Sequence, residues 1–425
     1  MLSEDDIRRA TAALDGPLAA LAKRFPGESD QRQPVHTVYG GAHLFKSDTA
    51  VKLGTLAQRA LQENAPDAAT FANAIGLAPS TAETVYGRVI EKLKREPVED
   101  FRIDFEDGYG NRPDEEEDGH AKQAAREVAA GLRNRTLSPF IGIRIKPFSQ
   151  ELTRRSVRTL DVFLSTLIGE AGKLPPWFVV TLPKIQVVEQ VTALANLFDV
   201  LEPKLGLQKG ALKFEFMIET TQSIAMLSQM LDAARGRVVA AHFGTYDYTA
   251  SCNITAAHQR MDHPACDFAR HSMQVAYAGT GLWLSDGATN VMPIGDRATV
   301  HRAWRLHVDH IRHSLVNGFY QGWDLNPSQL PTRYAAVYSF FLESLAPATD
   351  RLRNFMQRAG QATLVGDVFD DAATGQGLLN YFLRALNCGA ITEEEALATG
   401  LTLEELRSRS FVKILKGRRA VKASS

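Results

Sequence analysis

The sequence is poor in cysteine, in net charge and in long apolar runs. Its 425 residues include three cysteines, too few for a disulfide scaffold, which favours a reducing cytosol. The formal net charge is −1, so no global field attracts nucleic acid or an anionic membrane. No apolar segment is long enough to cross a bilayer, and the start, MLSEDDIRRATAAL, lacks the features of a signal peptide. We therefore expect a cytoplasmic protein without membrane or nucleic-acid partners.

Several common functional motifs are also missing. The sequence has no G-x-S-x-G, no P-loop and no G-x-G-x-x-G, so a serine hydrolase, an NTPase and a dinucleotide-binding enzyme lack support. The segment CNITAAHQRMDHPAC holds two Cys and two His, but their spacing is looser than the paired spacing of zinc sites. The sequence therefore gives no support for an enzyme that depends on a catalytic serine motif, a bound nucleotide or a zinc site.

The sequence does contain a regular alternation of short strand-like runs and helical patterns. The eight runs are PVHTVYGG, FRIDFEDGYG, FIGIRIKPF, WFVVTLPKI, LKFEFMIET, VVAAHFGTYDY, GLWLSDGATNVMP and GFYQGWDLNP. The first connection is longer than the others and contains two or three predicted helices. Eight strand–helix repeats predict a parallel sheet closed into a (β/α)₈ TIM barrel, a fold that takes about 250 residues.

We expect three parts along the chain. Residues 1–33 form an amphipathic helix and a polar linker, and residues 34–333 form the TIM-barrel catalytic domain. Residues 334–425 form a helical C-terminal lid or extension, with no further strand candidate of comparable strength. Four histidines of one helical segment are expected on a solvated helix surface: His301, His307, His310 and His313.

Charged residues occupy one face of at least three predicted strands. In FRIDFE, residues 101–106, apolar residues alternate with Arg102, Asp104 and Glu106, and IGIRIK and KFEFMIE alternate in the same way. An unpaired buried charge is costly, so these groups must pair, bind a metal or meet water at the barrel mouth. For Arg102 and Glu215 we favour a structural ion pair in the lumen.

Polar residues also stand at or just after the C-terminal ends of several strands: Glu106, Asp107, Arg144, Lys184, Glu219, Asp247 and Asn326. Active sites of this fold lie at that rim, so the shared position favours function over surface solvation. Glu219 and Asp247 follow adjacent strands, and two carboxylates without a His/Cys set suit Mg²⁺, or Mn²⁺ in its place. Arg144 would then donate to the oxyanion of a metal-bound 2-oxo acid and stabilise an enolate.

Six short motifs occur across roughly residues 100 to 330, in the order DFEDG, GIRI, LPKI, MIET, FGTYD and GWDLNPSQLP. They resemble the motifs of the HpcH/HpaI aldolase and citrate lyase β-subunit superfamily, although Asn326 stands where that family has a histidine. The resemblance implies Mg²⁺ at Glu219 and Asp247, with Arg144 on the substrate and Glu106 near the metal. It also implies a homo-oligomer and a CoA thioester as a candidate substrate. We further predict substrate contacts from Lys184, Gly244 and Thr245.

The C-terminal segment FDDAATGQGLLNYFLRALNCGAIT resembles the E-D-x-A-T segment of malate synthases, which belong to the same superfamily. The resemblance implies that Asp371 is the catalytic acid or base. The structural alternative is that Asp370 or Asp371 only caps the following helix.

These observations predict a Mg²⁺-dependent carbon–carbon lyase that acts through an enolate on a small 2-oxo or 3-hydroxy acid, with an acyl-CoA as a candidate form of the substrate. Arg144, Glu106 and Asp371 are the predicted catalytic residues. Two alternatives remain open. One is a malate-synthase-like condensing enzyme that ends with thioester hydrolysis. The other is a non-catalytic regulatory protein that binds 2-oxo acids or phosphoenolpyruvate.

Overall fold

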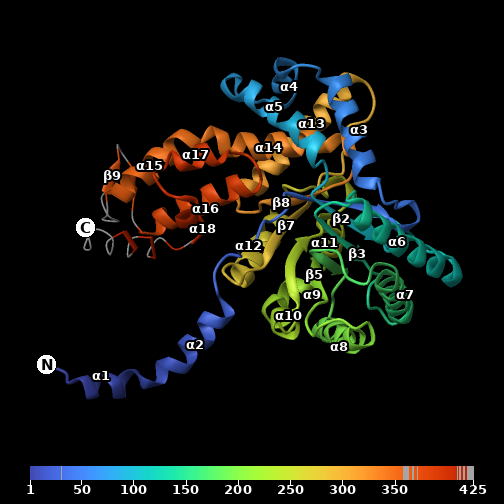
Figure 1. The fold of residues 1–425 in the computed structure, drawn as a ribbon, viewed down its shortest axis with the longest axis horizontal. Helices are drawn as coiled ribbons and strands as arrows, with labels where there is room; N and C mark the ends of the chain where they lie inside the picture. The colour runs from blue at the N-terminus through green and yellow to red at the C-terminus, as the bar shows by residue number, and fades with distance from the viewer. Residues whose placement is uncertain are drawn as a thin grey trace. The chain divides into compact units, whose positions relative to one another are not determined.

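The computed structural model describes residues 1–29, 31–357, 363–365, 368–370, 372–408, 410, 413–414 and 417–418. Eight parallel strands form a closed barrel in chain order, with β1 paired to β8 (Figure 1). The strands are β1 His36–Gly41, β2 Asp100–Asp104, β3 Phe140–Arg144, β4 Phe178–Leu182, β5 Lys213–Ile218, β6 Val238–Phe243, β7 Trp283–Ala288 and β8 Gln321–Asp324. Each predicted run coincides with one strand, with β2 beginning one residue before its run, so the predicted TIM barrel is confirmed.

Helices connect the strands as expected. The first connection contains α3 Thr49–Asn64, α4 Ala68–Ile75 and α5 Pro79–Arg95. The later ones contain α6 Asp114–Asn134, α7 Thr153–Ala171, α8 Val188–Lys204, α9 Thr221–Ala225, α10 Leu227–Ala233, α11 Thr245–Ser251, α12 Pro264–Tyr277 and α13 Arg297–Val316. Four acidic residues in the first turn of α6 interact favourably with the positive end of its helix dipole.

The chain divides into two compact units that are interleaved in sequence. Unit 1 comprises residues 1–29, 146–156 and 179–284, and it contains β5, β6 and nearly all of β4. Unit 2 comprises residues 31–145, 157–178 and the described residues from 285 onward. It contains β1, β2, β3 and β8.

The C-terminal region is not purely helical. It contains α14 Leu330–Glu343, α15 Leu345–Gln357, α16 Ala372–Asn387, α17 Glu393–Leu397 and α18 Leu403–Arg407. Between α15 and α16, however, β9 Thr363–Val365 pairs antiparallel with β10 Val368–Asp370. The sequence offers no strand candidate of comparable strength in this region, because three-residue strands are too short to produce a clear periodic pattern. The sequence TLV-GD-VFD does carry a hairpin signal, a Gly-Asp pair between two strand-like runs.

Two of the four helix histidines are buried, which corrects the expectation for them. His307 and His310 lie on the face of α13 that also buries Trp304 and Ile311. His307 Nδ1 lies 2.8 Å from Thr332 Oγ1, and its Nε2 lies 3.0 Å from an oxygen of Asp324. The spacing of the histidines did not reveal that this face of α13 is buried, because histidine is common both on surfaces and in interiors.

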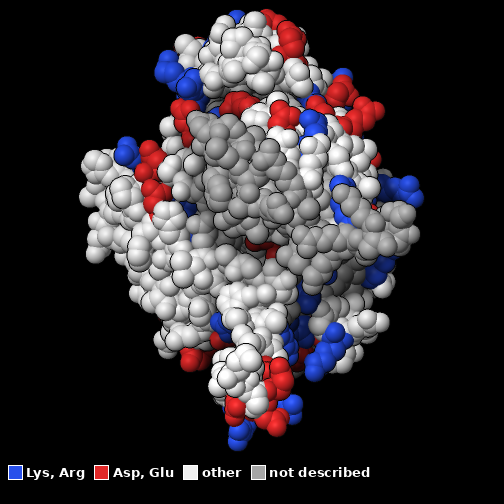
Figure 2. Space-filling model, turned by 90° about the vertical axis from the view of Figure 1, so that its left-hand side faces the viewer, with Lys and Arg blue, Asp and Glu red and all other residues white. Residues whose placement is uncertain are grey.

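The surface agrees with the balanced composition. On the face drawn in Figure 2, basic and acidic side chains are interspersed over the residues that the structure describes. Within those residues, no helix has both the length and the apolar character needed to span a membrane.

At the N-terminus, α1 Glu4–Thr11 and α2 Asp15–Arg24 are joined by the 3₁₀ turn η1 Ala12–Leu14, so two helices stand where one was predicted.

Candidate functional site

Arg144, the last residue of β3, is held by a carboxylate from the neighbouring strand of unit 2. Asp104 ends β2 directly opposite Arg144 in the parallel register. Arg144 donates to Asp104 through Nε at 2.7 Å and through Nη2 at 2.5 Å. The same carboxylate accepts the backbone N–H groups of Glu106, at 3.0 Å, and Gly108, at 2.7 Å. Four hydrogen bonds thus fix Asp104, and the bidentate pair fixes the plane of the guanidinium.

The third nitrogen of Arg144 faces other partners. Nη1 lies 3.1 Å from Glu106 Oε2 and 3.9 Å from Asp107 Oδ2. The guanidinium carbon lies 4.8 Å from the ring centre of Tyr39 and 5.5 Å from that of Trp323, within the range of cation–π attraction. Arg144 is therefore placed by two carboxylates and two aromatic rings, and its side chain is only 2% exposed.

Electrostatics keep this arginine charged. Burial by itself would lower the pKa of Arg144, but the carboxylates of Asp104 and Glu106 outweigh burial and hold that pKa well above its usual value. A charged, planar donor with a fixed orientation can bind a substrate carboxylate or stabilise an oxyanion.

The turn after β2 depends on close backbone approach. A Cβ at Gly108 would lie 2.7 Å from Asp104 Oδ2, and a Cβ at Gly41 would lie 2.4 Å from the carbonyl oxygen of Gly108. Cβ atoms in proteins essentially never approach another heavy atom this closely, so a side chain at either position would force its neighbours to move, and glycine avoids this. The segment HTVYGGAHLFKSD thus provides Tyr39 beside Arg144 and Gly41 beside the DFEDG turn.

Unit 1 brings together Glu219, Gly244 and the strand-end lysine. Glu219 directly follows β5, is buried, and accepts the backbone N–H of Lys184 at 2.8 Å. The N–H of Gly244 donates to the carbonyl of Ile218 at 2.9 Å, which extends the β5–β6 pairing by one residue. A Cβ at Gly244 would lie 2.6 Å from both Cβ and Oε2 of Glu219. Glycine at this position therefore makes room for the carboxylate.

Lys184 contacts both predicted metal ligands. Its backbone has φ +50°, a left-handed conformation that is uncommon outside glycine. Its Nζ lies 3.6 Å from Oδ2 of Asp247, which stands in the first turn of α11 and is half-exposed. The backbone of Lys184 thus holds Glu219, while its ammonium group neutralises Asp247.

These two carboxylates have the chemistry of a magnesium site. Over the described part of the chain, no group of three or more His, Cys, Asp or Glu side chains is arranged to hold a metal ion. A cation at Glu219 and Asp247 would therefore take its remaining ligands from water and substrate. This is how Mg²⁺ is commonly bound, so the residues present fit that ion.

Two other predicted residues have different surroundings. Thr245 is buried, and its hydroxyl lies 3.0 Å from Sδ of Met261, so this side chain is engaged in packing. Its role as a substrate-binding residue stays a prediction. Asp371, the predicted acid or base, lies outside the described residues.

The charged residues deeper in the strands have local partners. Arg102 pairs with Asp100 within β2. Glu215 accepts a hydrogen bond from Thr181 Oγ1 at 2.5 Å, and its Oε2 lies 3.1 Å from His242 Nε2. His242 is a buried core histidine. These contacts give the interior charges a structural role.

Three residues around Arg144 were not predicted as site residues. Asp104, Tyr39 and Trp323 all contact its guanidinium. For Asp104 a signal existed, because it shares the charged face of FRIDFE with Glu106. For Tyr39 and Trp323 the sequence offered no comparable signal, because both occur in runs that read as ordinary strands.

Comparison with known proteins gives one family and several related folds. A family model described as a domain of unknown function (DUF6986) matches residues 15–414. No curated protein matches the chain. A citrate lyase from Burkholderia xenovorans LB400 is 18% identical with a TM-score of 0.59, and the match covers 87% of this chain and 97% of that chain. Native malate synthase from Haloferax volcanii, determined with glyoxylate, is 14% identical with a TM-score of 0.51, and the match covers 87% and 99%. At these identities the likeness shows the fold alone.

Proposed function

The chain belongs to the family described as a domain of unknown function (DUF6986), and from its residues we propose that it is a Mg²⁺-dependent carbon–carbon lyase. Its substrate would be a small 2-oxo or 3-hydroxy acid, cleaved through an enolate. The observation that carries the proposal is the pair of carboxylates Glu219 and Asp247. They follow the adjacent strands β5 and β6, and Lys184 contacts both.

Glu219 and Asp247 are the proposed metal ligands. The Lys184 N–H orients Glu219, and the close packing of Gly244 limits how far that carboxylate can turn. The ammonium group of Lys184 keeps the charge of Asp247 compensated until a cation arrives. A bound Mg²⁺, or Mn²⁺, would supply Lewis acidity toward the carboxylate and keto oxygens of the substrate.

Arg144 is the proposed donor to the substrate oxygen that becomes negatively charged. Asp104 engages its Nε and Nη2, so Nη1 is the nitrogen best placed to donate outward, with Glu106 beside it. A donor fixed in advance needs no reorganisation when charge develops on the enolate. We propose that Glu106 takes part in catalysis by positioning Nη1 and nearby water.

Asp371 is the proposed acid or base that moves a proton to or from the substrate carbon. This role rests on the resemblance of FDDAATG to the malate synthase segment. An enolate mechanism needs such a group, because cleavage leaves a carbanion equivalent that must be protonated.

A malate-synthase-like condensing enzyme is the second candidate. The similarity of the fold to malate synthase and the FDDAATG segment favour it. The two candidates differ in their products. With glyoxylate and acetyl-CoA, the condensing enzyme releases free CoA, which a thiol reagent detects. A lyase instead splits a hydroxy acid or its CoA ester and releases a 2-oxo acid or aldehyde.

A thermal-shift screen tests the shared part of both proposals. A ligand that binds only the folded protein raises its melting temperature, so 2-oxo acids and CoA thioesters are screened with and without Mg²⁺. We expect at least one 2-oxo acid to shift the melting temperature only when Mg²⁺ is present. Glu219→Ala should abolish that shift, and the exposed Glu189→Ala on α8 should leave it intact. A shift that survives Glu219→Ala would place the metal elsewhere.

A further inference from the structure

The N-terminal arm, residues 1–25, carries an apolar stripe that its own chain does not cover. No residue of α1, η1 or α2 is buried. Leu14, Leu18, Leu21 and Phe25 are spaced by four, three and four residues, which places them on one face of a helix. All four are exposed, the three leucines by about half of their surface. An exposed row of apolar side chains along one side of a helix is typical of a segment that packs against another surface.

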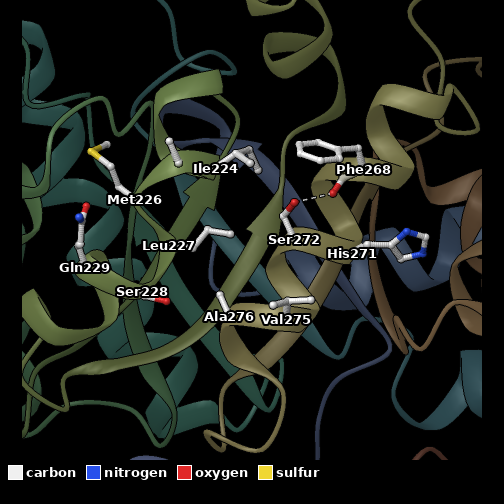
Figure 3. Close-up of a pocket in the computed structure, with 11 residues that line it drawn as sticks. Ile224, Met226, Leu227, Ser228, Gln229, Phe268, His271, Ser272, Val275 and Ala276 are labelled. Atoms are coloured by element: carbon white, nitrogen blue, oxygen red, sulfur yellow. Dashed lines mark hydrogen bonds between the residues drawn. The ribbon is translucent and has the colours of Figure 1, made fainter.

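The same unit contains an apolar groove with a volume of about 520 Å³. We call it the α12 groove. It runs between α12 and the segment that contains α9 and α10 (Figure 3). Ile224 and Leu227 contribute from one side, and Phe268 and Val275 contribute from α12. Phe268 is 63% exposed and Val275 is 87% exposed, so the groove presents large apolar side chains to solvent.

The base of the arm is fixed beside this groove. Arg24 forms an ion pair with Asp232 of α10, and its Nη2 lies 3.4 Å from the carbonyl oxygen of Ser228, a residue of the groove lining. The N–H of Gly27 donates to the carbonyl of Gly279, just after α12, at 2.8 Å. These contacts hold the end of α2 at the edge of the groove while its apolar stripe stays uncovered.

We propose that the N-terminal arm of one chain packs its leucine stripe into the α12 groove of a second copy. Each chain carries both surfaces in unit 1, so two copies related by a two-fold axis can exchange arms reciprocally. A helix that places residues at such spacing into an apolar groove is a recurring mode of recognition. Within one chain the stripe does not enter the groove, because no residue of α1, η1 or α2 is buried. The proposal is independent of the proposed function.

The oligomeric state of three variants tests the exchange. Leu18→Glu places a charge on the stripe, Val275→Glu places one in the groove, and Ala20→Glu places one on the opposite side of α2 as the matched control. All three sites are exposed, so the substitutions should leave folding intact. Sedimentation velocity should show a dimer or a multiple of it for the wild type. Loss of one buried leucine or valine contact should weaken association at least about tenfold, and the control should match the wild type.

A mixing experiment identifies which copy supplies the arm. Chains with Leu18→Cys and chains with Val275→Cys are mixed and oxidised, and we expect a disulfide-linked heterodimer. Chains with Ala20→Cys should cross-link far less with the Val275→Cys chains.

Several outcomes would overturn the proposal. A monomeric wild type would do so, as would an oligomer unchanged by Leu18→Glu. Dissociation by Leu18→Glu without an effect of Val275→Glu would show that the arms pair with each other. Cross-linking within single chains of the Leu18→Cys, Val275→Cys double variant, with no heterodimer in the mixture, would place the arm on its own groove.

Discussion

Replacing Asp104 by asparagine should strongly destabilise the protein. In the wild type, Oδ1 accepts from Arg144 Nε and from the N–H of Glu106, and Oδ2 accepts from Arg144 Nη2 and from the N–H of Gly108. The amide group of an asparagine would turn a donor toward two of these four donors. It would also remove the negative charge that compensates a buried guanidinium.

The expected loss follows from the burial of the pair. Breaking a buried ion pair by removing one partner costs about 3–5 kcal/mol. Glu106 still compensates part of the Arg144 charge at 3.1 Å, so we expect a value near the lower end, about 3 kcal/mol. The free energy of unfolding is measured by urea titration, with the slope of the transition compared between variants.

Asp107→Asn is the matched control for this substitution. Asp107 lies 3.9 Å from the same arginine, but its side chain is 58% exposed. An exposed ion pair contributes about 0–1 kcal/mol, so this variant should unfold almost like the wild type. Equal losses for the two variants, or a loss below about 1 kcal/mol for Asp104→Asn, would refute the view that Asp104 is what fixes Arg144.

Two further substitutions test other parts of the structure. Gly244→Ala should push Glu219 aside and weaken Mg²⁺ binding measured by calorimetry. The control Gly169→Ala on α7, where an added Cβ meets open space, should bind Mg²⁺ like the wild type. Equal Mg²⁺ affinities of the two variants would argue against the close packing of Gly244 on Glu219. Burial would raise the pKa of Glu99, but Lys92 and other cations outweigh it and lower that pKa to about 2 from 4.5. Because the folded-state pKa is the lower one, this stabilisation is present above about pH 4.5 and should be lost as the pH falls toward 2, by about 3 kcal/mol in total. Urea unfolding between pH 6 and pH 3 should show about 2 kcal/mol of this loss for the wild type, because about a third of it occurs below pH 3. The free energy of unfolding should fall less steeply with pH for Glu99→Gln, and equal pH dependence of the two proteins would contradict the assignment.

The barrel could be predicted because its signals are local and repeated. Each strand is a short apolar run bounded by turn residues, and the helical patterns recur between them. The charged faces of FRIDFE and KFEFMIET were visible in the same way, because side chains alternate along any strand. Local patterns thus indicated which residues end the strands.

The partners of those residues could not be predicted, because they depend on pairing between distant segments. Asp104 meets Arg144 through the register of β2 and β3, which neither strand specifies by itself. Tyr39 and Trp323 reach the same guanidinium from opposite ends of the barrel sequence because β1 pairs with β8. The burial of His307 depends in the same way on Asp324 and on the packing of α13 against α14.

Direct measurement of Mg²⁺ binding tests the central claim. Isothermal titration calorimetry compares the wild type with Glu219→Gln and with the exposed control Glu189→Gln. The account predicts one saturable site in the wild type and in the control, and its loss in Glu219→Gln. Undiminished Mg²⁺ binding by Glu219→Gln would contradict it.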